Sequence, residues 1–119
     1  MLEKTLRLVQ LYDIYGVLLT KRQQEFFRLY FEEDLSLGEI AAEFNISRQA
    51  VHDILNRGEA SLVKWEHGLN LVESSLQRKQ IINEIFSLLK NLKKELTADG
   101  KGWALVTKIK LLLELLART

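Results

Sequence analysis

The stretch LSLGEIAAEFNISRQAVHDILNRG, residues 35–58, carries the strongest local signals of secondary structure in the chain. Ser36 is followed three residues later by Glu39, the spacing of a capping box at the start of a helix. Asn45 tolerates the left-handed backbone conformation that ends helices, and Ser47 is a second candidate cap. The pattern predicts two helices joined by a three- or four-residue turn, the first of them barely two turns long.

Apolar and polar side chains separate onto two faces of the second of these helices. The inward face is predicted to hold Ala50, Val51, Ile54, Leu55 and Gly58. The outward face is predicted to hold Arg48, Gln49, His52, Asp53 and Asn56. Arginine pairs with guanine, glutamine pairs with adenine, and aspartate can accept from cytosine, so the outward set can read base edges in a major groove.

Two more helices are predicted before this stretch. Thr20 and Gln23 have the capping-box spacing, and the acidic residues 32–34 should end the helix that begins there because they oppose its dipole. Apolar residues at three- and four-residue steps predict an N-terminal helix over 1–18 with a buried stripe of Leu8, Leu11, Tyr12, Tyr15, Leu18 and Leu19. Other apolar residues remain around this helix, so it should be covered on more than one side.

The C-terminal part is predicted to add two amphipathic helices. From Arg48 the chain can stay helical to about Trp65, with an interruption at Gly58 and a bend or cap at His67-Gly68. A heptad-like rhythm follows at Ile82, Ile85, Leu89, Leu92 and Leu96. After a loop over 98–102, the last helix should place on one side Trp103, Val106, Ile109, Leu113 and Leu116. We expect an all-α protein with an N-terminal helix over 1–18, a helix-turn-helix over 19–65 and a C-terminal extension over 66–119.

Composition excludes several classes of protein. The 119 residues, 28% of them charged, suit one small domain or a domain with an appendage. Cysteine is absent, which excludes disulfide frameworks, thiolate catalysis and iron–sulfur chemistry, and proline is absent, which favours helix throughout. No apolar run is long enough for a membrane span and no signal-peptide pattern occurs, so we expect a cytoplasmic protein.

Charge is unevenly distributed along the chain. The net charge is 0 over residues 1–19, −4 over residues 20–76 and +5 over residues 77–119, within a total of +1. An anionic partner should therefore be attracted first to the positively charged C-terminal part. Solvated helix faces are the alternative explanation for this pattern.

No enzymatic constellation is visible in the sequence. His52 and His67 lie fifteen residues apart without an adjoining ligand motif, and Gly100-Lys101-Gly102 lacks the rest of a phosphate-binding loop. We predict no catalytic residue, no metal site and no cofactor.

The motifs around the turn resemble a known transcription module. Residues 19–23, LTKRQ, and residues 35–51, LSLGEIAAEFNISRQAV, look like region 4 of bacterial sigma-70-type factors, a helix-turn-helix. Residues 46–53, ISRQAVHD, with Arg57-Gly58-Glu59 and Trp65-Glu66 near Leu69, more narrowly resemble the YlxM-like family. The genes of that family lie beside those of the signal recognition particle GTPase, so the resemblance implies a DNA-binding regulator or an accessory of that pathway. It extends to about residue 96.

The resemblance assigns roles to particular positions. The groove-reading positions of the sigma-like recognition helix are occupied by Ser47, Arg48, Gln49, His52 and Asp53. The positions that contact the DNA backbone or brace the helices are occupied by Thr20, Lys21, Arg22 and Arg57. So few basic groups imply weak or dimer-dependent binding, since phosphate contacts supply most nonspecific affinity.

Other roles are open for the same residues. Arg48 could pair with Glu39 or Glu43, and Asp53 with Arg57, which leans toward an intramolecular brace. Trp65 and Trp103 are expected to be core or interface anchors rather than platforms for bases.

Three kinds of partner are expected. The first is double-stranded DNA. The second is a second copy of the chain, because surplus apolar surface lies on residues 2–18 and 103–116. The alternative to DNA is the RNA or the GTPase of the signal recognition particle, reached through the basic residues Arg78, Lys79, Lys90, Lys93, Lys94, Lys101, Lys108 and Lys110.

Overall fold

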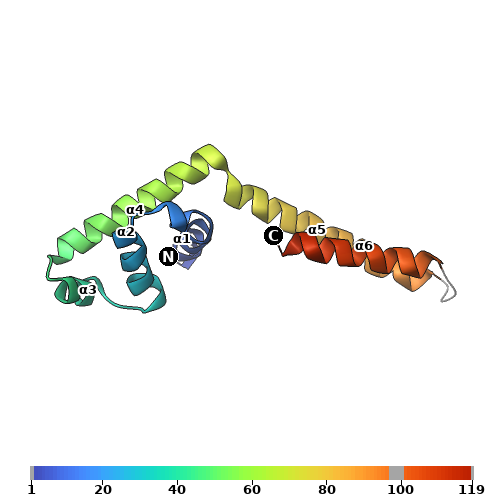
Figure 1. The fold of residues 1–119 in the computed structure, drawn as a ribbon, viewed down its shortest axis with the longest axis horizontal. Coiled ribbons are helices and arrows are strands. Elements are labelled where there is room, and N and C mark those ends of the chain that lie inside the picture. Colours follow the sequence, from blue (N-terminus) through green and yellow to red (C-terminus); the bar gives the residue numbers. More distant parts are fainter. Residues whose placement is uncertain (1, 97–100, 119) are drawn as a thin grey trace. The chain divides into compact units, whose positions relative to one another are not determined.

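The computed structural model describes residues 2–96 and 101–118, and every regular element in this part of the chain is helical. The elements are α1 (Leu2–Tyr15), the 3₁₀ turn η1 (Gly16–Leu18), α2 (Lys21–Phe27), the π-helical turn η2 (Arg28–Glu32), α3 (Leu37–Phe44), α4 (Arg48–Leu69), α5 (Leu71–Glu95) and α6 (Lys101–Ala117), shown in Figure 1. The prediction of an all-α protein is confirmed. Internal contacts divide the chain into two compact units, Met1–Val72 and Glu73–Thr119.

The predicted helix starts are present in the first unit. The hydroxyl of Thr20 accepts from the Gln23 amide at 3.1 Å while the Gln23 side chain accepts from the Thr20 amide at 3.0 Å. Ser36 and Glu39 make the same reciprocal pair. Two of the four amides left unpaired at a helix start can be satisfied this way without help from the rest of the fold.

Helix α4 is the support on which the first unit is built. Helices α1, α2 and α3 all pack against it, as Figure 1 shows. The core contains Phe26, Ile40, Val51 and Leu62, none of which has any exposed surface. The core thus collects residues from three separate helices onto one face of α4.

The N-terminal helix ends earlier than predicted. Helix α1 stops at Tyr15, and Gly16 begins a 3₁₀ turn in which an added Cβ would lie 3.0 Å from the Tyr12 ring. This change of helix type turns Leu18 outward with 56% of its surface exposed. The prediction that Leu18 belongs to the buried stripe is therefore wrong, whereas Leu8, Leu11 and Leu19 are buried as expected.

Helix α4 runs further than predicted. It continues unbroken through Gly58 and Gly68 to Leu69, and its C-cap Asn70 has a left-handed backbone with φ 55°. Gly58 does not interrupt the helix. Its missing side chain leaves space that the ring of Phe27 occupies. The prediction of a bend or cap at His67-Gly68 is likewise wrong, since Asn70 supplies the left-handed cap two residues later.

A buried polar anchor holds the end of α4. The hydroxyl of Tyr15 donates to Oε1 of Glu66 at 2.6 Å and accepts from the amide of Leu71 at 3.0 Å. The same carboxylate oxygen accepts from the amide of Val72 at 2.9 Å, and Nη2 of Arg7 lies 3.9 Å from the other oxygen. The two side chains thereby satisfy the first amides of α5 within the first unit.

This anchor predicts a loss of stability at alkaline pH. Burial, with the hydrogen bond to Glu66, raises the pKa of Tyr15 above its usual 10.0. An unfolded tyrosine ionises first, so the contribution of Tyr15 is fully present below pH 10 and is lost as the pH rises through the folded-state pKa. Urea midpoints between about pH 8 and 11 should fall more steeply for the wild type than for Tyr15→Phe, and parallel declines would contradict this assignment.

The second unit is a helical hairpin of α5 and α6, which Figure 1 shows running in opposite directions. Nε1 of Trp103 donates to the carbonyl of Leu96 at 3.4 Å, and Nζ of Lys93 lies 4.6 Å from the centroid of the Trp103 ring. The anchoring role expected of Trp103 is thus observed within the hairpin. The buried side chains here are Ile82, Val106 and Leu113.

Several C-terminal predictions need correction. Ile109 and Leu116 were expected beside Val106 and Leu113, but both are exposed, as is Leu92 in α5. A helix that packs against a single neighbour buries only one narrow stripe of side chains. Ile109, Leu116 and Leu92 lie on the adjacent stripe of their helices and are therefore exposed. Of the loop predicted over 98–102, residues 98–100 lie outside the described part of the chain, while Lys101 and Gly102 belong to α6.

Candidate nucleic-acid interface

The turn between α3 and α4 positions the candidate site. Asn45 is left-handed with φ 55°, and the amide of Ile46 donates to the carbonyl of Ala41 at 3.0 Å. The Ser47 hydroxyl then caps α4 by accepting from the amide of Ala50 at 3.0 Å. Because both faces of this corner are held by the buried side chains of Ile40 and Val51, α4 begins at a defined place and direction.

The structure places every residue predicted to read bases at the surface. Exposed side chains at the start of α4 are those of Ser47, Arg48, Gln49, His52 and Asp53. The inward set divides as predicted, with Val51, Leu55 and Gly58 buried and Ala50 and Ile54 partly buried. The first turns of α4 therefore present a polar ridge to solvent.

Two hydrogen bonds join members of this ridge. Nε2 of Gln49 donates to Oδ1 of Asp53 at 3.0 Å, and the Asn56 amide lies 3.3 Å from Nδ1 of His52. Exposed pairs of this kind at a four-residue spacing contribute only about 0.2–0.5 kcal/mol, so base edges can displace them at little cost. Asn56 completes the ridge although the resemblance to known families did not assign it a role.

The intramolecular roles considered for the arginines are not observed. In the described part of the chain, Arg48 makes no ion pair with Glu39 or Glu43, and Asp53 bonds to Gln49 rather than to Arg57. Arg48 and Arg57 are both exposed. Both guanidinium groups are consequently available for an external anion.

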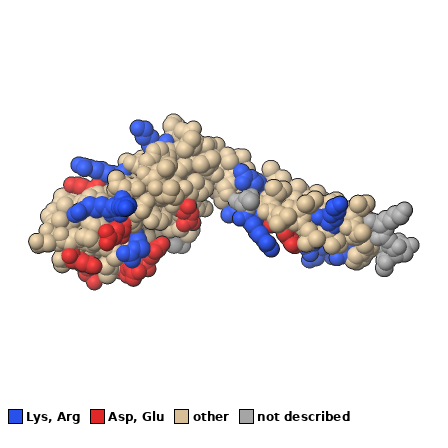
Figure 2. Space-filling model, viewed as in Figure 1, with Lys and Arg blue, Asp and Glu red and all other residues tan. Residues whose placement is uncertain are grey.

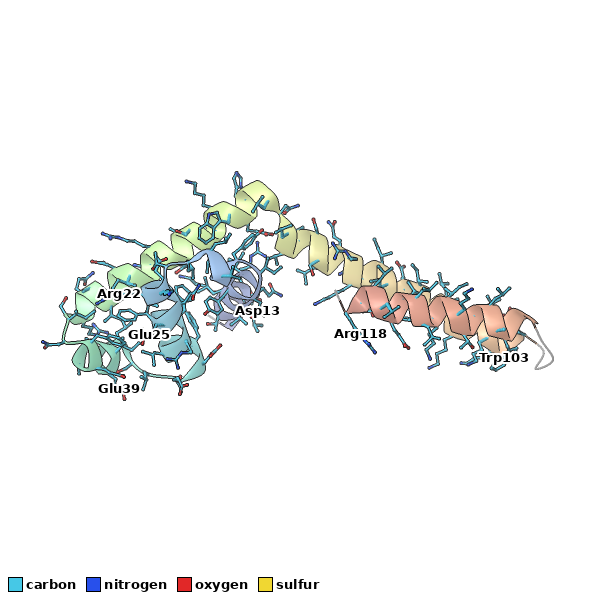
Figure 3. All side chains as sticks on the ribbon, viewed as in Figure 1. Asp13, Arg22, Glu25, Glu39, Trp103 and Arg118 are labelled. Atoms are coloured by element: carbon cyan, nitrogen blue, oxygen red, sulfur yellow. The ribbon has the colours of Figure 1, made fainter. Side chains whose placement is uncertain are left out.

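The residues of the sigma-like LTKRQ segment lie at the start of α2. Thr20 caps that helix, yet its hydroxyl hydrogen can still be donated to a phosphate. The guanidinium carbon of Arg22 lies 5.3 Å above the ring of Phe26, whose centroid is 4.9 Å from that of Phe44 at the end of α3. Arg22, labelled in Figure 3, is thus linked through Phe26 to the last residue of α3.

The charge of the first unit is mixed around this site. Figure 2 shows basic and acidic side chains interspersed over its helices. Glu39 is exposed in the first turn of α3, and the hydrogen bonds from Ser36 lower the pKa of its carboxyl group. Local acidity of this kind weakens attraction to a polyanion and makes contacts at particular positions more important.

Among the described residues there is neither a metal-binding cluster nor a membrane-spanning helix. Within residues 2–96 and 101–118, no group of three His, Asp or Glu side chains is placed to hold a metal ion. In the same ranges no helix combines the length and apolarity needed to cross a bilayer. His52 and His67 are exposed side chains, as predicted.

One structural feature was missed at the sequence level. Tyr15 and Glu66 are separated by 51 positions, and no sequence pattern relates one to the other. A glutamate in a helix is normally expected to be exposed to solvent. The burial of Glu66 becomes visible only when the neighbouring helix is in place.

Comparison with known proteins assigns the chain to a family. A family described as "Putative helix-turn-helix protein, YlxM / p13 like", UPF0122, matches residues 2–99. A UPF0122 protein of Geobacillus sp. (strain WCH70) is 47% identical over 85 residues, which cover 71% of this chain and 77% of the relative. One from Desulforamulus reducens is 52% identical over 77 residues, covering 65% and 66%. One from Bacillus mycoides (strain KBAB4) is 46% identical over 89 residues, covering 75% and 81%.

The match includes the whole candidate site and ends before α6. It covers α1 to α5, and therefore the turn, its caps and the polar ridge. Since the match spans well over half of the chain, this protein belongs to the UPF0122 family of YlxM / p13-like helix-turn-helix proteins.

Proposed function

We propose that this protein is a non-catalytic regulator that binds double-stranded DNA with the first turns of α4 in the major groove. The observation that carries the proposal is the exposed ridge at the start of α4, held at a fixed corner by buried apolar contacts. Arg48, Gln49 and Asp53 are side chains with complementary base edges, and the positive end of the α4 dipole faces the same side.

The contacts to the DNA backbone in this proposal come from the start of α2 and from the part of α4 beyond the ridge. Thr20, Lys21 and Arg22 stand at the start of α2, and Arg57 follows the ridge on α4. Four phosphate contacts would give a salt slope of about −3.6 for log K against log salt concentration. Binding by one copy should therefore be weak at physiological salt, and two linked copies would bind better.

We also propose the pathway in which this regulator acts. The resemblance to the YlxM-like family implies a role in the signal recognition particle pathway, inside the cytoplasm. The charge of the second unit favours a second candidate function, binding of the particle's RNA or of its GTPase. Exposed basic side chains on α5 and α6 are Arg78, Lys79, Lys90, Lys94, Lys108 and Lys110.

A pair of charge reversals separates the two functions. Arg48→Glu with Gln49→Ala should weaken binding to duplexes selected from a random pool by at least about tenfold, because each good base contact contributes about 1–3 kcal/mol. The measurement is fluorescence anisotropy at two salt concentrations. The control is Lys90→Glu with Lys94→Glu, two exposed residues of the second unit. Lys93 is unsuitable because it covers the Trp103 ring.

The outcomes of this experiment are distinct. If the α4 variant binds duplexes as tightly as the wild type while the α5 variant loses binding to the particle's RNA, the DNA-reading function is wrong and the alternative stands. If only the α4 variant binds the selected duplexes more weakly than the wild type, the DNA-reading function is supported. Circular dichroism checks that both variants stay helical.

A further inference from the structure

The hairpin of the second unit exposes an unusual set of apolar side chains. Large apolar residues at 37–65% exposure occur on both of its helices. On α5 the stripe consists of Ile81, Ile85, Leu88 and Leu92, of which Ile85 is partly buried. On α6 the stripe consists of Leu105, Ile109, Leu112 and Leu116. Both follow the same 4-3-4 spacing, which keeps each stripe on one side of its helix.

The two stripes lie on the same side of the hairpin. Ile81 and Leu88 each precede by one position the residues that face α6, Ile82 and Leu89. Leu105 and Leu112 likewise precede the buried Val106 and Leu113 on α6. One position corresponds to about 100° of rotation in an α-helix. Because the two helices run in opposite directions, equal rotations turn both stripes toward one common face, which we call the apolar face.

Between Ile81 and Leu92 on α5 and between Leu105 and Leu116 on α6, no charged side chain interrupts the apolar face, and the exposed Arg78 stands at its end on α5. The opposite side of the hairpin carries Lys79, Lys90 and Lys94 on α5 and Arg118 after α6, all exposed. At the outer borders of the apolar face, α5 places Glu84 and Glu95, whereas α6 places Lys108. The two borders thus have opposite charge.

We infer that a second copy of this chain covers the apolar face, forming a four-helix bundle from two hairpins. Monomeric soluble proteins rarely expose continuous apolar patches beyond about 300–600 Å², and a stable interface needs about 800 Å² from each partner. Two stripes of four large side chains on parallel tracks provide a surface of that order. Bundles of two hairpins pack such stripes into a common core.

A second copy fits better than other occupants. With α5 packed against α6 of the partner, the Glu84 and Glu95 border meets the Lys108 border, so the charges at the rim are complementary. Those same glutamates would be repelled by an anionic membrane surface, and the lysines that could attract one lie on the opposite side. The inference does not depend on DNA binding, and it assigns the dimer interface to α5 and α6 rather than to residues 2–18.

Two neighbouring leucines provide a matched test. Leu112 lies on the apolar face and Leu111 lies outside it, and the two are 55% and 56% exposed. Sedimentation of the full chain at tens of micromolar should give twice the monomer mass of 13.8 kDa for the wild type and for Leu111→Glu. Leu112→Glu should raise the dimer dissociation constant by at least about 100-fold, because two carboxylates would be buried per dimer. A monomeric wild type, or equal effects of both substitutions, would overturn the inference.

Cross-linking gives a second readout that does not require a disruptive substitution. The chain has no cysteine, so a single introduced one can be labelled uniquely. A bismaleimide long enough to cross the diagonal of a four-helix bundle should join two copies of Leu112→Cys and leave Leu111→Cys, which lies outside the apolar face, mainly uncoupled. Equal coupling, or preferential coupling of Leu111→Cys, would contradict the proposed face even if the chain is dimeric.

Discussion

Replacing Phe26 with alanine should lower the free energy of unfolding of the first unit by about 3–5 kcal/mol. The Phe26 side chain has no exposed surface, and its ring lies 4.9 Å from that of Phe44. It therefore joins α2 to the end of α3, immediately before the turn, and its removal leaves a cavity that the three surrounding helices cannot fill. Small domains have only about 5–15 kcal/mol of total stability, so this loss should be visible directly in urea unfolding followed by circular dichroism.

Tyr30→Ala is the matched control for this change. Tyr30 is also aromatic and lies one turn further along, in η2, but it is 37% exposed. Its truncation removes less buried area and should cost less than half as much. Equal costs for the two substitutions would show that Phe26 does not hold α2 and α3 together in the way described here.

Replacing Gly58 with leucine should destabilise the first unit by at least about 3 kcal/mol. A Cβ at this position would lie 2.5 Å from Cε2 of Phe27. Phe27 cannot easily move aside, because its ring stacks on Tyr12 at 5.6 Å and on Phe31 at 5.5 Å. Overpacking a filled core usually costs about 1–3 kcal/mol, and here a whole isobutyl group must be accommodated.

Gly68→Leu should change stability in the opposite direction. Gly68 lies in the same helix, is exposed, and has no heavy atom within 4 Å of an added Cβ. Leucine forms helix better than glycine by roughly 0.5–1 kcal/mol, with a smaller gain near the helix end. Urea midpoints of the two variants should therefore shift in opposite directions. A comparable loss for Gly68→Leu would mean that α4 is generally intolerant of side chains.

The features predictable from the sequence are those that depend on near neighbours. The caps at Thr20, Ser36 and Ser47 and the left-handed Asn45 were all predicted, because each is completed by atoms within three or four residues. The polar ridge of α4 was predicted for the same reason, since helical periodicity alone separates Arg48 and Gln49 from Val51 and Leu55. Its role in binding remains a prediction.

Errors arose where the decisive neighbour was distant in the chain. Gly58 suggested a break in α4, because glycine weakens a helix when nothing else is known about its surroundings. In the structure, the ring of Phe27 from α2 packs directly against Gly58, so this glycine allows close packing inside a continuous helix. Ile109 and Leu116 were placed on the buried side of α6 because an all-round apolar helix offers several stripes, and periodicity cannot say which one meets a partner.

The sequence by itself determined that this protein is helical, where α2, α3 and α4 begin, and which polar side chains share the outer face of α4. Only the tertiary structure decided that Tyr15 meets Glu66 across 51 positions, that Gly58 makes room for Phe27, and that two stripes on α5 and α6 share one face. The physical reason is range: hydrogen bonds at a helix start act within one turn, whereas packing joins side chains that no local pattern relates.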